Sequence, residues 1–110
     1  MSFEIRTIST FDRELKKLAK KYPSIKTDLL ALMEALLKDP FQGDGLGKDC
    51  YKVRMRITSK GKGKSAGSRV ITCVKVINER ITLVSIYDKS DQTDIPDNLL
   101  LQILKDNELI

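Results

Sequence analysis

The sequence predicts an α+β domain in which two consecutive helices cover one face of a small sheet. Three observations lead to this prediction: the element order β-α-α-β-β-β-α, the apolar stripes of two neighbouring helices, and two late strands that are apolar on both sides. At 110 residues, of which 41% are apolar, the chain can bury a core but is too short for two domains. Residues 1–110 are therefore expected to form a single domain.

A strand and a helical hairpin are expected in the first third of the chain. Residues 3–8 alternate between apolar and polar side chains, which indicates a strand. Ser9 with Asp12 resembles a capping box, so a helix is expected to start at Ser9 and to end at Pro23. A second helix is expected over residues 24–38. Because the connection is short, the two helices form an antiparallel hairpin whose apolar stripes must cover a sheet.

Strands and glycine-rich loops make up most of the remaining chain. The glycines of residues 43–47 predict a loop, and residues 59–67, SKGKGKSAG, predict a flexible basic loop. A last helix is expected to open at Pro96. Three strands are expected, at residues 51–58, 68–77 and 80–88.

Positive charge is concentrated in the middle of the sequence. The net charge is +5, but residues 48–75 carry nine basic groups and one acidic group. Residues 1–47 carry eight basic and seven acidic groups, and residues 79–110 carry three and seven. A basic middle beside an acidic end predicts a binding site for a polyanion in the middle of the chain.

The strand at residues 51–58 separates apolar from basic side chains. Its apolar positions are expected to face the helices, so that Lys52, Arg54 and Arg56 project from the opposite face. Successive cations would lie roughly 6.5–7 Å apart, close to the spacing of phosphates along a nucleic-acid strand. The competing interpretation is a solvated edge strand protected from aggregation by its charges. Edge protection does not need nine cations in one segment, so the polyanion site is favoured.

Several kinds of chemistry are excluded by composition. The chain has no histidine, so it cannot build a Ser-His-Asp or Cys-His site, and the cysteines form no zinc-binding pattern. Cys50 and Cys73 lie in strand-like runs and are expected to be buried, reduced thiols. The aspartates of residues 88–97 are explained by helix capping and the helix dipole better than by a metal cluster. We therefore expect no metal and no cofactor.

The sequence also shows no sign of a membrane segment. The N-terminal residues lack the apolar core of a signal peptide, and no apolar run approaches the ~20 residues needed to span a bilayer. A cytoplasmic protein with no membrane partner is the expectation.

Three segments, CYKVRMR, GKGKSAGSRVI and ITLVSIYDKSD, resemble the RelE/ParE superfamily of bacterial toxins, and its RelE and HigB branches most of all. The resemblance covers nearly the whole chain. It implies a small twisted antiparallel sheet with the helical hairpin on one face and the active surface on the other. It also implies an endoribonuclease that cuts mRNA in the ribosomal A site and is neutralised by a cognate antitoxin. The implied partners are the antitoxin, the ribosome, mRNA and, through the antitoxin, operator DNA.

The resemblance also carries functional residues over by position. They are Lys52, Arg54, Arg56, Arg69 and Lys89, with lysine at position 89 where RelE has an arginine. Ile95 occupies the position of a catalytic tyrosine in RelE, which leaves Tyr87 as the only nearby phenol. The remaining lysines of the segment, which we expect to grip RNA without doing chemistry, are Lys48, Lys60, Lys62 and Lys64.

A reaction by the 2′-hydroxyl of RNA needs a base, cations for the phosphorane, and an acid for the leaving oxygen. We expect Lys52 to be the base, because neighbouring cations favour a neutral amine, with Arg54 as a phosphate clamp. Arg69 would stabilise the phosphorane, and Lys89 or Tyr87 would assist the leaving group. The alternatives are a ParE-like gyrase-inhibiting toxin, a non-catalytic nucleic-acid-binding module, and an inactive member that only pairs with an antitoxin.

Overall fold

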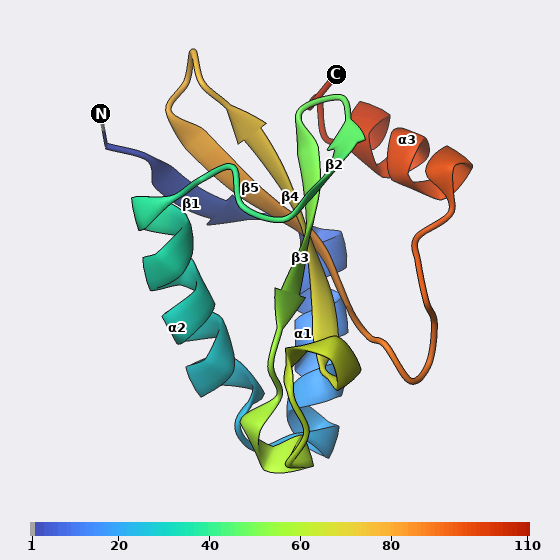
Figure 1. Cartoon of the computed structure of the whole chain (residues 1–110). Coiled ribbons are helices and arrows are strands. Elements are labelled where there is room, and N and C mark those ends of the chain that lie inside the picture. Colours follow the sequence, from blue (N-terminus) through green and yellow to red (C-terminus); the bar gives the residue numbers. More distant parts are fainter. Residues whose placement is uncertain (1) are drawn as a thin grey trace.

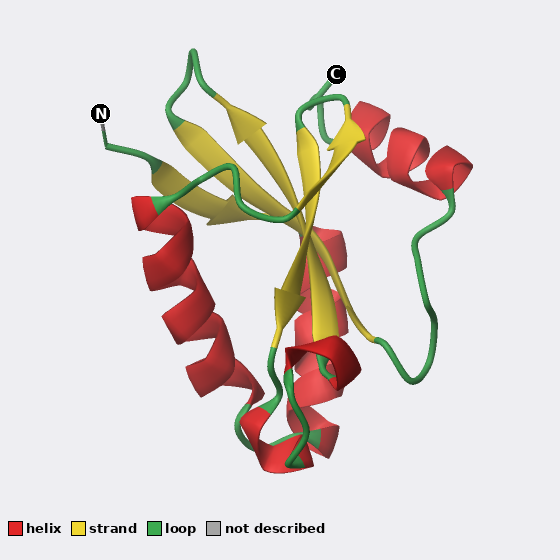
Figure 2. Cartoon of the chain, viewed as in Figure 1, coloured by secondary structure: helices red, strands yellow, loops and turns green. Residues whose placement is uncertain are grey.

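The computed structural model of the chain describes residues 2–110, apart from the side chain of Lys64. Within these residues a five-stranded sheet has the strand order β1-β5-β4-β3-β2, with two helices on one face and a third on the other (Figure 1). The strands are β1 (Glu4–Thr7), β2 (Asp44–Gly47), β3 (Cys50–Met55), β4 (Ser68–Lys75) and β5 (Arg80–Asp88). The helices are α1 (Ser9–Lys21), α2 (Ile25–Lys38) and α3 (Asp97–Asp106); two short 3-10 helices, Thr58–Lys60 and Lys64–Ala66, lie between β3 and β4 (Figure 2).

The helical hairpin forms where the sequence predicts it, but its first helix starts without a side-chain cap. Ile8 is the N-cap of α1 and Ser9 is the first helical residue, so the capping box expected from Ser9 and Asp12 is wrong. Asp12 still lies in the first turn, where a carboxylate is favoured by the helix dipole. The buried residues of the hairpin are Phe11 and Leu18 on α1 and Ile25, Leu29, Leu32 and Leu36 on α2.

The α+β class is confirmed, but the sheet differs from the expectation in two details. β1 pairs with β5 in the parallel direction, with Glu4 opposite Arg80, whereas the other pairings are antiparallel. The glycines of residues 43–47 belong largely to an edge strand, β2, rather than to a loop. Gly43 has φ 101°, and a Cβ there would lie 2.6 Å from the carbonyl oxygen of Lys52. This glycine is therefore needed where the chain passes close to β3.

The segment between β3 and β4 is anchored to the scaffold, although the sequence predicts a flexible loop. The strand expected over residues 51–58 already ends at Met55, and the two 3-10 helices follow it. Asp28 on α2 accepts hydrogen bonds from both the backbone N–H and the hydroxyl of Thr58. A Cβ on Gly67 would clash with the carbonyl oxygen of Met55, so only glycine lets the end of this segment close against β3.

Apolar side chains form one cluster on each face of the sheet. The larger cluster lies between the helical hairpin and the sheet and includes Phe11, Leu36, Val53, Val70, Ile81 and Ile86. The smaller cluster lies under α3 and contains Cys50, Ile71, Cys73, Val84, Tyr87, Ile95, Leu100 and Leu104. Each fully buried leucine stabilises the fold by roughly 1.5–3 kcal/mol, so α3 is held by apolar contact rather than by charge. Among residues 2–110, none of the helices is long and apolar enough to cross a bilayer.

Candidate active site

The strand register brings three predicted site residues into one row across the sheet. Arg54 on β3 lies opposite Arg69 on β4, and Arg69 in turn lies opposite Tyr87 on β5. Lys52 lies two residues before Arg54 on β3, opposite Ile71. Cys50, Ile71 and Tyr87 belong to the cluster under α3, so by strand alternation this row lies on the α3 face. Residues from three strands thus meet on the sheet face opposite the helical hairpin.

Arg69 is the most enclosed cation of the row. Only 5% of this residue is exposed, and its guanidinium donates hydrogen bonds to the carbonyl oxygens of Ser68 and Ser65, each at 3.1 Å. These bonds fix the direction of the guanidinium and connect it to the end of the segment between β3 and β4, residues 56–67, which we call the basic segment. A guanidinium has five N–H donors in a planar fork that matches the oxygens of a phosphate, so a fixed arginine is well suited to an anion.

Lys52 forms an ion pair with Asp94, an acid that the sequence pattern assigns to helix capping. Its Nζ lies 3.5 Å from Oδ2 of Asp94, and 20% of its side chain is exposed. Asp94 lies in the connection to α3, where its Oδ1 also accepts the backbone N–H of Ile95. The expectation that the aspartates of residues 88–97 only cap and favour the helix dipole is therefore incomplete: Asp97 lies in the first turn of α3, but Asp94 pairs with the candidate base.

Tyr87 lies beneath the same connection. It is 4% exposed, and its hydroxyl has no hydrogen-bond partner among the described residues. Burial raises the pKa of Tyr87, the charge of Asp94 adds to this effect, and Arg69 opposes it. The phenol is therefore protonated at neutral pH and can act as a proton donor but not as a base. Ile95, at the position of the tyrosine expected from RelE, is buried in the cluster under α3 and is a core residue here.

The side chains of Arg54 and Arg56 border a separate hollow against α2. The expectation that Arg56 projects from the face opposite the helices is therefore wrong, because β3 already ends at Met55. Both residues are exposed and line a cavity of about 260 Å³ together with Thr58 of the basic segment and Asp28 of α2. The backbone of Arg54 thus belongs to the row, while its exposed guanidinium lies at the rim of this hollow. The hollow thus presents two guanidinium groups and one carboxylate, and that carboxylate already accepts two hydrogen bonds from Thr58.

Lys60 does not project into solvent as an RNA contact. Its Nζ lies 2.8 Å from Oδ1 of the buried Asp88 and 2.5 Å from the hydroxyl of Ser90, and it stands 5.8 Å from the centre of the Tyr22 ring. These contacts correct the expectation for Lys60, whose charge is used inside the protein. They also correct the interpretation of Asp88 as a helix-capping acid, since this carboxylate is buried at the end of β5.

The other predicted lysines lie at three places. Lys62 and Lys89 are exposed and line a hollow of about 320 Å³ beside the end of β5, and the backbone N–H of Lys89 donates to Gly67. Lys48 is exposed in the turn between β2 and β3, and it borders a different hollow next to the start of α3. The side chain of Lys64 lies outside the described residues. Of these lysines, Lys89 lies nearest to the row along the chain, two residues after Tyr87.

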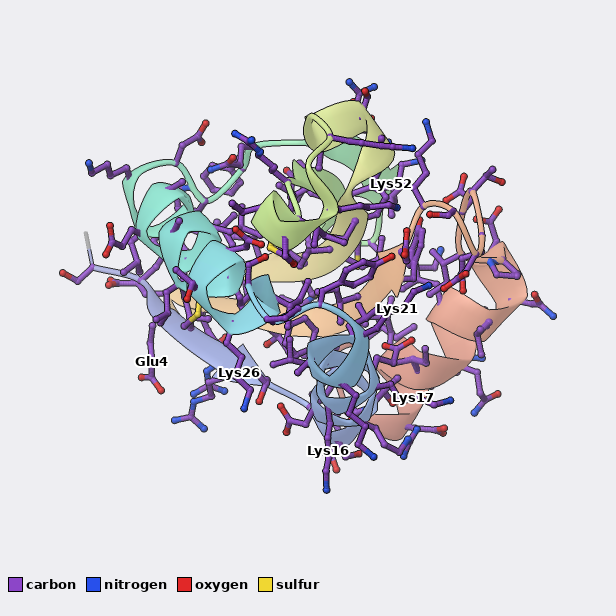
Figure 3. All side chains as sticks on the ribbon, turned by 90° about the horizontal axis from the view of Figure 1, so that it is seen from below. Glu4, Lys16, Lys17, Lys21, Lys26 and Lys52 are labelled. Carbon is purple, nitrogen blue, oxygen red and sulfur yellow. The ribbon has the colours of Figure 1, made fainter. Side chains whose placement is uncertain are left out.

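A second basic surface was missed by counting charges along the sequence. It consists of the exposed side of α1, from which Lys16, Lys17 and Lys21 project in Figure 3, and includes Arg13, Lys16, Lys17, Lys20 and Lys21. The near-neutral total of residues 1–47 hides this face, although helical periodicity places all five cations opposite the apolar stripe. Lys17 and Lys21 also border a hollow of about 340 Å³ that reaches Tyr87. The surface therefore adjoins the candidate site.

Comparison with known proteins agrees with this fold. A family model described as the RelE toxin of the RelE/RelB toxin–antitoxin system matches residues 8–105. An arginine-substituted mutant of the E. coli toxin RelE in the free state has 18% sequence identity and a TM-score of 0.62, covering 96% of this chain and 97% of that chain. The E. coli RelBE toxin–antitoxin complex has 20% identity and a TM-score of 0.60, covering 80% and 96%. The chain therefore belongs to the RelE toxin family.

Proposed function

We propose that the protein is a ribosome-dependent endoribonuclease that cleaves mRNA in the A site and thereby inhibits translation. Membership of the RelE toxin family supports a toxin of a toxin–antitoxin system. The observation that carries the enzymatic part is the register that aligns Arg54, Arg69 and Tyr87 across β3, β4 and β5, with Lys52 beside them. Cations and a protonated phenol on one rigid sheet are what phosphodiester cleavage needs when no histidine is present.

In the proposed reaction the 2′-hydroxyl of RNA attacks the adjacent phosphorus and gives a 2′,3′-cyclic phosphate. Lys52 is the proposed base, and it must separate from Asp94 before its amine can meet the hydroxyl. Arg69, whose guanidinium is already fixed by two carbonyl oxygens, stabilises the charge of the phosphorane. Arg54 clamps a neighbouring phosphate from the rim. The leaving 5′-oxygen receives a proton from Tyr87 or from Lys89, which lies two residues further along the chain.

The site is closed in the free chain, and this favours a requirement for the ribosome. Arg69 and Tyr87 are almost completely buried, and Asp94 lies over Lys52. Lys52 can meet RNA only after its ion pair with Asp94 has opened. A substrate that is positioned by a large partner can supply the binding energy for such a movement, whereas a free RNA strand in solution supplies little.

The proposed protein partner is a cognate antitoxin. The E. coli RelBE structure contains a related toxin together with its antitoxin, and this chain has the same fold. A segment that covers the basic row should carry acidic and apolar side chains, because it must match cations and the apolar cluster under α3. Co-purification of the protein with the product of a short neighbouring reading frame would test this pairing.

Primer extension on mRNA, with and without ribosomes, tests the enzymatic proposal. We expect cuts only with ribosomes, and a loss of roughly 10²–10³ in cleavage rate for Arg69→Ala. Arg6→Ala, which removes an exposed arginine of β1, is the matched control and should cleave like the wild type. Cleavage by Arg69→Ala within a few-fold of wild type would contradict the assignment. Breaks in DNA that depend on gyrase would favour the ParE-like alternative, and RNA binding without cleavage would favour a non-catalytic module.

A further inference from the structure

Two buried thiols face each other across the sheet beneath α3. Cys50 on β3 and Cys73 on β4 are register partners, and both are free thiols with at most 1% of their surface exposed. The backbone N–H of Val74 donates to the carbonyl oxygen of Asp49 at 2.8 Å, which makes Cys50 and Cys73 a non-hydrogen-bonded pair of the ladder. In such pairs the Cα atoms are about 4.5 Å apart and the side chains are at their closest.

This geometry falls inside the range of natural disulfides, whose Cα atoms are usually about 4.4–6.8 Å apart. The thiol of Cys50 donates to the carbonyl oxygen of Lys48 at 3.5 Å, and its interaction with the neighbouring thiol raises the pKa of Cys50 and lowers that of Cys73. Cys73 is therefore the better nucleophile of the pair, because the thiolate is the reactive form. No displacement of β3 relative to β4 is needed to join the two sulfur atoms.

α3 controls access to the pair. The thiols lie in the same apolar cluster as Leu100 and Leu104 of α3, and they are almost completely buried there. The connection before α3 is mostly exposed and is tied to β3 through the Lys52–Asp94 ion pair. A small oxidant can therefore meet the thiols only when α3 has lifted from the sheet.

We propose that Cys50 and Cys73 are a redox-active pair that forms a cross-strand disulfide with a low-molecular-weight disulfide as oxidant, and that α3 gates this reaction. The thiolate of Cys73 attacks one sulfur of oxidised glutathione, breaks its S–S bond and releases one glutathione thiolate. Cys50 then gives its proton to solvent and attacks the Cys73 sulfur of the mixed disulfide, releasing the second glutathione. The protein loses two hydrogens in total, and oxidised glutathione is reduced to two thiols.

The disulfide would close a loop that carries the basic row. Residues 50–73 include Lys52, Arg54 and Arg69, so the disulfide would join β3 and β4, the two strands that carry these cations, covalently. A loop of this length stabilises a protein through the entropy of the unfolded chain, which corresponds to a rise in Tm of up to about 15 °C for a chain of this size. The oxidised protein should therefore melt higher than the reduced one.

The test treats the folded full-length protein with oxidised glutathione and follows intact mass and peptide cross-links. The expected product has lost two hydrogen atoms, carries no glutathione and joins the peptides of Cys50 and Cys73. Cys50→Ser, which lacks the resolving thiol, should instead keep one glutathione, whereas Cys73→Ser, which lacks the attacking thiol, should react much more slowly. Retained glutathione on the wild type, cross-linked dimers, or a Tm that does not rise would overturn the disulfide.

Gating by α3 is tested with a pair of cavity variants. Leu104→Ala weakens the contact of α3 with the sheet and should accelerate disulfide formation by at least about tenfold. Leu32→Ala removes a buried leucine of α2 from the opposite face and is the matched control for general destabilisation. Equal acceleration by both variants, or no acceleration by Leu104→Ala, would overturn the gating role of α3.

Discussion

Replacing Lys60 with methionine removes the cation that faces a buried carboxylate and keeps a side chain of similar length. The carboxylate of Asp88 has no exposed surface at the end of β5. It accepts hydrogen bonds from Lys60 at 2.8 Å, from the hydroxyl of Tyr22 at 2.5 Å, and from the backbone N–H and the hydroxyl of Ser90. In the variant, neutral donors and the more distant cation of Lys21 must stabilise a carboxylate that cannot reach water.

The expected loss follows from what remains around the carboxylate. Removing one partner of a buried ion pair costs about 3–5 kcal/mol. The three neutral hydrogen bonds persist, and Nζ of Lys21 lies 3.9 Å from the other carboxylate oxygen. We therefore expect Lys60→Met to lower the free energy of unfolding by about 2–3 kcal/mol. For a chain of this size, that loss corresponds to a fall in Tm of roughly 10 °C.

The pH dependence of the loss identifies its origin. Burial alone would raise the pKa of Asp88, but hydrogen bonds from Lys60, Tyr22 and Ser90 outweigh it and hold the pKa well below its usual range. Since the unfolded state then binds this proton more readily than the folded state, stability rises with pH through this range. The contribution is complete above the unfolded pKa of about 4 and is lost as the pH falls towards the folded pKa.

Urea unfolding of wild type, Lys60→Met, Asp88→Asn and the double variant at pH 7 and pH 3 measures these effects. The difference between wild type and Lys60→Met should be largest at pH 7, and the double-mutant cycle should show coupling between the two positions. Lys62→Met, which changes an exposed lysine of the same segment, should leave stability within about 0.5 kcal/mol. A loss for Lys60→Met no larger than that of Lys62→Met, or equal at both pH values, would refute the reasoning.

Three further predictions concern other parts of the chain. Gly67→Ala should cost about 1–3 kcal/mol of stability and slow cleavage on ribosomes, because the new methyl group pushes the basic segment off β3; a urea titration and primer extension that match wild type would contradict this. Glu14 is half-buried and burial raises its pKa, so its ionisation weakens the fold as pH rises through that pKa; Glu14→Gln should raise stability at pH 7 by less than about 1 kcal/mol and leave it unchanged near pH 3, as thermal melts can show. Lys17→Gln with Lys20→Gln should weaken binding to ribosomes and make the dependence of log K on log salt shallower by about 0.7–0.9 for each phosphate that is no longer neutralised, whereas Lys38→Gln on α2 should leave the salt slope unchanged.

Local patterns were enough to predict the helices and the alternating strand. The apolar stripe of α2 and the alternation of β3 are properties of neighbouring residues, so they can be read before any tertiary contact is known. β2 escaped detection because its glycines have the composition of a loop. Only the close approach of Gly43 to Lys52 explains why glycine is needed in this region, and that approach is a tertiary fact. The parallel direction of β1 also depends on a partner far away in the sequence.

The residue types of the candidate site could be predicted from the sequence, but the ion pairs that its side chains form could not. Alternation placed Lys52 on the face opposite the hairpin, but it did not show that the side chain of Arg54 borders a hollow against α2. The resemblance supplied Arg69 and Tyr87. The sequence could not show that Lys60 turns inward to Asp88, since that carboxylate is buried only once β5 and the basic segment have come together.

The parallel pairing of β1 with β5 has a consequence for the order of folding. β1 joins the sheet only through β5, so the first strand and the last strand must meet before the sheet is complete. During synthesis on a ribosome, β1 stays unpaired until residues 80–88 have emerged. The helical hairpin likewise cannot pack until the sheet surface that it covers has formed. Contacts of such large sequence separation form slowly. The toxin fold is therefore finished late, when nearly all of the chain has been synthesised.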